Sequence, residues 1–213
     1  MKIVNASFEI LTPINREEIL RDIEKIGRTC YKSENKITND SASKFISAIV
    51  ANGHESVLEH KIISVKFICD RGVSHEIVRH RIASYTQEST RFCNYSNNKF
   101  DNEITVIKPL FFNDKSCAYN FWYNIMQTIE YDYLKLLQLG VKAEEARSVL
   151  PNSLKTELIA TMNLREWRHF LKLRTTPVSH PQMREITVPL LNTFKKCLPE
   201  IFNDITIIEK ENK

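Results

Sequence analysis

The chain has 213 residues, of which 42% are hydrophobic, enough for one sizeable core, so the sequence predicts a single domain over residues 1–213. Lys and Arg number 30 against 26 Asp and Glu, which gives a formal net charge of +4. Because these charges are spread along the chain, they argue against a polymeric nucleic acid as partner. No apolar run approaches the roughly 18 to 20 residues of a bilayer span, so we expect no membrane segment.

The cysteines and the amino-terminal segment indicate the cellular compartment. Five cysteines stand far apart, without a C-x-x-C pair, which argues against both a disulfide framework and a zinc knuckle. Polar residues at Asn5, Ser7 and Glu9 interrupt the amino-terminal apolar residues, which is not typical of a secretion signal. We therefore expect a protein of the reducing cytoplasm.

The first elements are a strand and a helix. Residues 2–11 alternate loosely and contain β-branched residues, which predicts a strand. Residues 15–31 carry apolar residues at helical spacing. Asn15, with Glu18 three residues later, is typical of a capping box at the start of that helix.

The next elements repeat this order and end in a short helix. Residues 41–53 predict a helix that ends at Gly53. Residues 61–70 place apolar side chains on one face with period two, the clearest strand pattern in the sequence. From Gly72 onward we expect a short helix with Ser74 as its N-cap.

The second half of the chain predicts two strands and then long helices. Residues 91–95 and 103–109 have strand patterns. Residues 114–139 predict a long helix, rich in aromatic residues, that ends at Gly140. Residues 142–150 predict a short helix that Pro151 terminates.

Toward the carboxyl end, helices dominate. Residues 156–163 are ambiguous between strand and helix, and residues 164–174 predict a helix. Another helix follows Pro181, which Pro189 must kink or end. Strands and helices intermixed in this way, with two adjacent hairpin-like strands at residues 91–95 and 103–109, predict an α+β fold with a mostly antiparallel sheet.

One stretch, RHRIASYTQESTR at residues 79–91, concentrates hydrogen-bond donors. Consecutive helical residues point about 100° apart, so Arg79, His80 and Arg81 do not all face one side. Arginine offers a planar fork of donors that suits a phosphate or the edge of a heterocycle, and hydroxyl side chains follow. The stretch predicts a cradle for a phosphate and a base, and a solvated charged face is the alternative.

Other residues leave two further alternatives open. GHESVLEH at residues 53–60 contains two histidines and two carboxylates, compatible with a metal-dependent hydrolase, although no H-E-x-x-H pair occurs. The basic residues are also compatible with a non-catalytic module that binds nucleotides or RNA.

Cys93, close to Arg91, is either a thiol of lowered pKa or a packing residue.

Taken together, four segments resemble one family. Arg79-His80-Arg81, Ser89 and Arg91 match R-H-R-x7-S-x-R, the signature of the flavin-dependent thymidylate synthases. GHESVLEH matches the upstream G-H-x-[ST]-x-x-E-H block of that family. EEARSVLP resembles its arginine-leucine-proline segment, and MNLREWRHFLKLR followed by SHPQMREI resembles its C-terminal signature.

The resemblance implies an α+β subunit, with helices packed against a curved sheet, and a homotetramer whose active sites are shared between subunits. It implies conversion of dUMP to dTMP, with methylenetetrahydrofolate as one-carbon donor and NADPH as reductant through FAD. It implies no metal, nucleic acid or membrane partner. Among many members Asn-Glu stands where this chain has Thr86-Gln87, so the contact at Gln87 becomes neutral.

The resemblance also assigns residues. Arg174 would be catalytic, because a guanidinium beside uracil N3 stabilises the negative charge that develops there and replaces a cysteine nucleophile. No Pro-Cys dipeptide, the context of such a cysteine, occurs in the chain. The implied FAD contacts are His54, Ser56, Glu59, Arg79, His80, Arg81, Gln87, Asn163, Arg165 and His169. The implied dUMP contacts are Glu76, Arg79, Gln87, Glu88, Ser89, Thr90, Arg91, Arg147 and Arg174.

Overall fold

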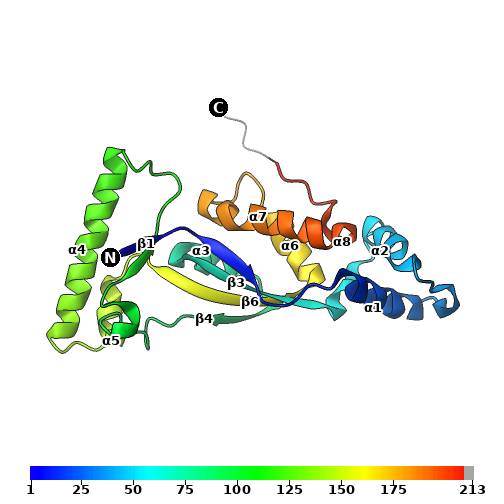
Figure 1. Ribbon diagram of the computed structural model, residues 1–213, viewed down its shortest axis with the longest axis horizontal. Helices are drawn as coiled ribbons and strands as arrows, with labels where there is room; N and C mark the ends of the chain where they lie inside the picture. The colour runs from blue at the N-terminus through cyan, green and yellow to red at the C-terminus, as the bar shows by residue number, and fades with distance from the viewer. Residues whose placement is uncertain (209–213) are drawn as a thin grey trace. The chain divides into compact units, whose positions relative to one another are not determined.

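Strands and helices are mixed along the chain, as predicted, in the computed structural model, which describes residues 1–208 (Figure 1). The strands are β1 (Lys2–Val4), β2 (Ser7–Ile10), β3 (Ile62–Asp70), β4 (Ala83–Gln87), β5 (Thr105–Ile107) and β6 (Lys155–Asn163). The α-helices are α1 (Arg16–Thr29), α2 (Ser41–Ala51), α3 (Arg71–Ile77), α4 (Cys117–Gln138), α5 (Ala143–Ala146), α6 (Leu164–Arg174), α7 (Pro181–Cys197) and α8 (Pro199–Phe202). Short 3-10 helices are η1 (Glu34–Lys36), η2 (Glu55–His60), η3 (Asn98–Phe100) and η4 (Arg147–Val149).

The larger sheet has four strands in the order β2-β3-β6-β4 and is antiparallel. A second, two-stranded sheet pairs β1 with β5 in parallel, with Lys2 opposite Thr105. The α+β class with a mostly antiparallel sheet is therefore confirmed. In β3 the predicted period of two is also confirmed, since its alternate side chains are buried, namely Ile63, Val65, Phe67 and Cys69.

Contacts within the chain fall into two compact units, each made of three separate segments. Unit 1 consists of Met1–Phe8, Lys66–Arg79 and Tyr85–Ile159. Unit 2 consists of Glu9–Val65, His80–Ser84 and Ala160–Lys213. A single domain over residues 1–213 stays a prediction.

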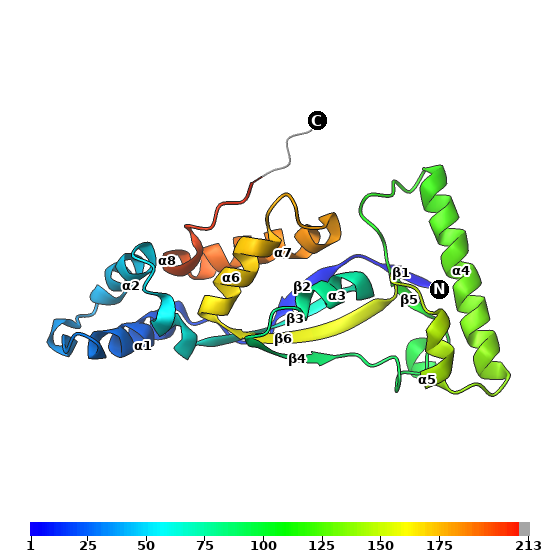
Figure 2. The same ribbon diagram turned by 180° about the vertical axis from the view of Figure 1, so that it is seen from behind.

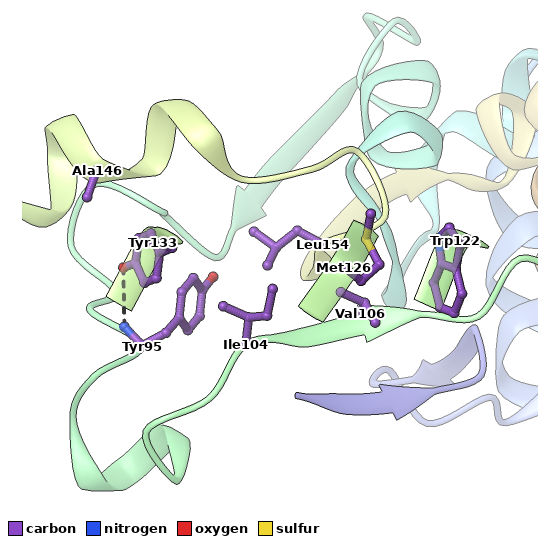
Figure 3. Packing of buried hydrophobic residues seen from close by; sticks show 8 residues of the cluster. All are labelled: Tyr95, Ile104, Val106, Trp122, Met126, Tyr133, Ala146 and Leu154. Carbon is purple, nitrogen blue, oxygen red and sulfur yellow. Dashed lines mark hydrogen bonds between the residues drawn. The ribbon is translucent and has the colours of Figure 1, made fainter. Parts of the chain in front are cut away.

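The core of unit 1 lies along α4 (Figure 3). Trp122, Met126 and Tyr133 of this helix pack with buried residues of the neighbouring segments, namely Tyr95, Ile104, Val106, Ala146 and Leu154. The helix begins behind Ser116, whose side chain accepts from the backbone N–H of Tyr119. It ends just before Gly140, whose φ of +88° favours glycine, as the sequence predicts.

In unit 2, helices α6 and α7 lie side by side in both views, and α2 packs against α1 and α8 (Figure 1, Figure 2). Trp167 of α6 is fully buried, and its Nε1–H donates to the carbonyl of Ile63 across 3.0 Å. Its ring makes edge contacts with Phe170 and Phe194. This packing fixes α6 on β3. Within residues 1–208 no helix is both long and apolar enough to cross a bilayer.

The capping predictions for two helices had different outcomes. Asn15 caps α1, because its side chain accepts from the backbone N–H of Glu18 across 3.3 Å, as predicted. Ser74 as the N-cap of the next helix is wrong. Asp70, in extended conformation at the end of β3, caps α3 by accepting from the N–H of Val73 across 2.8 Å. Ser74 lies inside that helix.

The predicted strand at residues 91–95 is wrong. The N–H groups of Phe92 and Cys93 both donate to the carbonyl of Ser89, which closes a turn there. The strand lies earlier, as β4 inside the arginine-rich stretch, beside β6 in the sheet. Residues 2–11 form two strands, β1 and β2, rather than one.

Proline positions decide several boundaries near the carboxyl end. Pro189 does not end its helix, since α7 continues to Cys197. Pro199 begins α8, at a first-turn position where a missing N–H costs nothing. The ambiguous segment 156–163 is strand β6, and the helix predicted at residues 164–174 is confirmed as α6.

Candidate active site

A glycine turn places the 53–60 block at the surface of unit 2. Helix α2 ends at Ala51, and Gly53, two residues later, has a φ of +71°. The N–H of Gly53 donates to the carbonyl of Val50 and that of His54 to the carbonyl of Ile49, the bonds of a Schellman motif. His54 is exposed, as is Ser56 within the 3-10 helix η2 that follows. The turn therefore presents the predicted flavin contacts of this block to solvent.

The amino end of α6 forms one wall of a pocket. Asn163 caps the helix, since its Oδ1 accepts from the N–H of Glu166 across 2.8 Å. Arg165 is exposed and pairs with Glu59 of η2. The pocket has a volume of about 530 Å³ and is lined by Glu55, Glu59, Ile82, Asn163, Arg165, Glu166, His169 and Lys172.

His80 is the buried member of the R-H-R motif. It is 6% exposed, whereas Arg79 and Arg81 on either side are exposed. Its Nδ1 lies 3.3 Å from Oε1 of Glu166. Its Nε2 accepts from Nε–H of Arg174 across 3.1 Å. The motif thus divides, with the arginines facing solvent and the imidazole facing α6.

Charge and burial around His80 keep its ring neutral. Burial, followed by the positive charges of Arg174 and His169, lowers the pKa of His80 to about 4. Burial also raises the pKa of Glu166, although His169 opposes this shift. At neutral pH the contact between His80 and Glu166 is therefore a hydrogen bond from a neutral imidazole to the carboxyl group rather than an ion pair.

Arg174, the predicted catalytic residue, is the last residue of α6. Its carbonyl accepts from Oγ1 of Thr187 in α7 across 3.0 Å, and Thr187 is fully buried. Its guanidinium is held by His80. The backbone and the side chain of Arg174 are each anchored by a buried residue.

Three potential metal ligands also meet here. One ligand atom from each of His80, Glu166 and His169 lies within 4.8 Å of the others. None belongs to residues 53–60, where the sequence suggested metal ligands. The cations Arg165, Lys172 and Arg174 belong to the same helix, and Arg174 bonds His80 directly, so the surroundings oppose a divalent cation.

The predicted substrate residues of unit 1 form their own network. Nε2 of Gln87 donates to Oγ of Ser74 across 2.9 Å and to Oγ1 of Thr156 across 3.2 Å. Glu88 accepts from the hydroxyl of Tyr95 across 3.1 Å and from Nζ of Lys155 across 3.0 Å.

Cationic and hydroxyl side chains meet next to this network. Nε of Arg91 donates to Glu144 across 2.9 Å, and Nη1 of Arg147 donates to Oγ1 of Thr90 across 3.4 Å. The backbone N–H of Arg91 donates to Oγ of Ser89 across 3.3 Å. The structure thus brings Ser89, Thr90, Arg91 and Arg147 together.

Cys93 is not the activated thiol that its closeness to Arg91 suggested. Burial, followed by the negative charge of Glu88, raises its pKa. The guanidinium of Arg91 instead pairs with Glu144. The interpretation of Cys93 as a thiol of lowered pKa is therefore wrong, and its contact with the core of unit 1 supports a packing role.

The two predicted ligand sets separate between the units. Except for Arg79 and Gln87, the flavin set belongs to unit 2, as His54, Ser56, Glu59, His80, Arg81, Asn163, Arg165 and His169. Except for Arg174, the dUMP set belongs to unit 1, as Glu76, Arg79, Gln87, Glu88, Ser89, Thr90, Arg91 and Arg147.

Sequence reasoning missed four residues of the pocket: Glu55, Ile82, Glu166 and Lys172. Glu166 had a detectable signal, since it lies three residues after the helix start at Asn163, on the side of α6 that carries buried Trp167 and Phe170. A carboxylate on a buried helix face needs a partner. Its partner, His80, is distant in sequence and was not deducible.

Comparison with known proteins identifies the family. The model of the family "Thymidylate synthase complementing protein" matches residues 14–200. The flavin-dependent thymidylate synthase of Pyrococcus furiosus is 34% identical over 171 residues, 80% of this chain and 69% of that protein. The enzyme of the same name from Geobacter sulfurreducens is 34% identical over 185 residues, 84% of this chain and 78% of that protein.

A solved structure supports the fold. The UMP/dUMP methylase PolB from Streptomyces cacaoi, bound with 5-Br dUMP, superposes with a TM-score of 0.77 at 22% identity and covers 95% of this chain and 96% of its own. At this identity the likeness supports the fold alone. The match of the family model over most of the chain, with relatives one-third identical, establishes that the chain belongs to the family of the flavin-dependent thymidylate synthases.

Proposed function

We propose that this chain is a flavin-dependent thymidylate synthase, a methyltransferase that converts dUMP to dTMP, with FAD as cofactor, methylenetetrahydrofolate as one-carbon donor and NADPH as reductant. Membership of the family supports this reaction. The observation that carries the proposal is the hydrogen bond from Arg174 to His80. It joins the R-H-R motif to the C-terminal signature, on which the resemblance depends.

The donors of the pocket in unit 2 fit FAD. The amino end of an eleven-residue helix, α6, carries the partial positive charge of the helix dipole, which suits a diphosphate. Arg165, Asn163 and His169 add side-chain donors that line the pocket, and Ile82 adds an exposed apolar surface. We assign to FAD these residues together with His54, Ser56, Glu59, Arg79, His80, Arg81 and Gln87. FAD supplies the hydride-transfer chemistry that the side chains lack.

Arg174 would activate the pyrimidine. A guanidinium stays protonated at all relevant pH values, so it stabilises negative charge on N3 and the carbonyl oxygens of uracil without exchanging a proton. Negative charge stabilised in this way raises the electron density at C5 of the pyrimidine. The higher density favours attack of C5 on the one-carbon unit. A neutral His80 supports this role, because it accepts a hydrogen bond from the guanidinium without adding a positive charge.

The unit 1 network would hold the nucleotide. Arg91 and Arg147 supply two cations, and Ser89 and Thr90 supply hydroxyl and backbone donors, which suit a phosphate monoester. Glu76, Gln87 and Glu88 would complete the site. Gln87 uses its Nε2 protons on Ser74 and Thr156, so its carbonyl oxygen is the part of the amide suited to accept from the nucleotide.

We further propose a cytoplasmic homotetramer with active sites shared between subunits. Helix α4 leaves Phe121, Ile125 and Tyr131 more than half exposed, at 71%, 53% and 67%. Large apolar side chains gathered on one helix are typical of an interface between subunits. All five cysteines are free, in agreement with a reducing compartment.

The test is an assay of the purified chain with dUMP, methylenetetrahydrofolate, NADPH and FAD. We expect dTMP, a visible flavin spectrum, and thymidine-independent growth of a thymidylate-synthase-deficient bacterium that expresses the chain. Arg81→Ala should lose flavin absorption, whereas the matched control Arg21→Ala, at another exposed arginine, should stay yellow. Dependence on a divalent metal, or salt-sensitive nucleotide binding without turnover, would contradict the proposal.

A further inference from the structure

The hydrogen bond from Arg174 shows which tautomer of His80 is present. A guanidinium has only donors, so the atom 3.1 Å from its Nε, Nε2 of His80, must carry a lone pair. A neutral imidazole then carries its proton on Nδ1. Oε1 of Glu166 lies 3.3 Å from that nitrogen and must therefore accept. The three side chains form one directed chain, from Arg174 through His80 to Glu166.

The chain is built from buried groups. His80 is 6% exposed and Glu166 is 7% exposed, so the bond between them does not compete with bulk water. Phe170 packs edge-on against the imidazole, with ring centroids 4.8 Å apart, and His169 lies at 5.6 Å. Glu166 is itself anchored, because its backbone N–H donates a hydrogen bond to Oδ1 of Asn163. The acceptor is therefore held in place independently of His80.

We propose that Glu166 is a positioning residue, which holds His80 in the Nδ1–H tautomer so that Nε2 accepts from Arg174 and orients its guanidinium. The inference rests on the proposed function for its kinetic consequence, but not for the tautomer itself. Without an acceptor at Nδ1, the proton moves to Nε2 and meets the Nε–H of Arg174. Two donors facing each other repel, and the guanidinium turns away.

The tautomer is measurable in the parent protein. In ¹⁵N-histidine-labelled protein, two-bond ¹⁵N–¹H correlation spectra distinguish the protonated from the unprotonated ring nitrogen, and His80→Asn assigns the signals by their loss. We expect a proton on Nδ1 of His80 and none on Nε2. A proton on Nε2 in the parent would overturn the inference without any variant and without any activity.

Two variants separate positioning from structure. Glu166→Leu removes the acceptor, whereas Glu166→Gln keeps a carbonyl that accepts from Nδ1–H. We expect Glu166→Leu to move the proton to Nε2 and to lower kcat about tenfold, with little change in KM for dUMP and full flavin content. Glu166→Gln should keep the parent tautomer and nearly all of kcat. Glu17→Leu, at an exposed carboxylate of α1, is the matched control.

The outcomes are distinct. Equal losses of flavin and of folded protein in Glu166→Leu and Glu166→Gln would show a structural role and overturn the inference. A parent tautomer and a parent kcat in Glu166→Leu would also overturn it. If the parent protein forms no dTMP at all, the proposed function fails, while the tautomers of parent and variants still decide the role of Glu166.

Discussion

Arg168 and Glu55, 113 positions apart in the sequence, are joined by two hydrogen bonds, from Nε at 3.0 Å and Nη2 at 2.9 Å to the same carboxylate oxygen. Arg168 has a side chain only 1% exposed, and it also pairs with Asp204 and donates to the carbonyl of Ile201. One guanidinium thus connects η2, α6 and the segment after α8. The ion-pair network fixes the 53–60 block against the helix that lines the pocket.

Removing this guanidinium should destabilise the protein. In Arg168→Met the carbonyl of Ile201 loses this donor, and Glu55 and Asp204 lose the closer of their two cations while Lys172 stays at 3.6 and 3.8 Å. A broken buried pair costs about 3 kcal/mol. Urea unfolding measures the loss. Lys172→Met, at a half-exposed cation near the same carboxylates, should change stability by less than about 0.5 kcal/mol. Equal effects of the two substitutions would contradict the dominant role of Arg168.

Arg174→Ala should lower the rate of dTMP formation about 10²- to 10³-fold, because it removes stabilisation of charge that develops mainly in the transition state. Flavin absorption should stay at the parent level. Single-turnover measurements with excess enzyme report the chemical step directly. An Arg174→Ala enzyme within a few-fold of the parent would contradict electrostatic activation by this residue.

Cys93→Ser should leave dTMP formation within a few-fold of the parent. The thiol of Cys93 has a raised pKa and is therefore protonated at neutral pH, so it is a poor nucleophile. Steady-state kinetics under the conditions used for Arg174→Ala test this directly. A folded, flavin-bound Cys93→Ser protein without activity would indicate thiol catalysis instead.

Stability should decrease as the pH falls from about 6.5 to about 4. Unfolded His80 takes up a proton with its ordinary pKa of 6.5, whereas in the folded protein its pKa is lowered to about 4. Between these two pH values the unfolded state binds the proton more tightly than the folded state does. The free energy of unfolding therefore decreases across this range, by on the order of 3 kcal/mol. Glu166, with its raised pKa, acts in the opposite direction.

Comparison with variants isolates the contribution of His80. Urea unfolding across this pH range should show a weaker pH dependence for His80→Asn than for the parent protein. His75→Asn, at an exposed histidine, should retain the parent dependence. If His80→Asn loses as much stability on acidification as the parent does, His80 is not the group that titrates.

Local patterns predicted most of the elements, and tertiary contacts decided the rest. The buried face of β3 and the cap at Asn15 depend on residues that are close in sequence. Periodicity and side-chain chemistry were therefore sufficient to predict them. The strand at Ala83–Gln87 is rich in polar residues and shows no alternation of apolar and polar side chains. It is a strand because it pairs with β6 in the sheet. Ser74 and Asp70 are both residue types that cap helices well. Asp70 is the cap because β3 ends there and α3 begins at the next residue.

The candidate site was predictable as a set of residues but not as a geometry. The R-H-R motif and the C-terminal signature named His80 and Arg174 separately, whereas their hydrogen bond spans 94 positions. Glu166 matched no motif. Its role depends on a buried partner from another segment, which hydrophobic periodicity does not report.

The interleaving of the two units has a consequence for how this protein can be divided. Each unit is assembled from three stretches of chain, so no single cut releases either one as a continuous piece. A continuous fragment of the gene therefore cannot carry all of the predicted flavin residues, or all of the predicted nucleotide residues, without segments of the other unit. Any truncation that removes one of these segments is therefore expected to disrupt one unit, and truncation cannot separate the two predicted ligand sets.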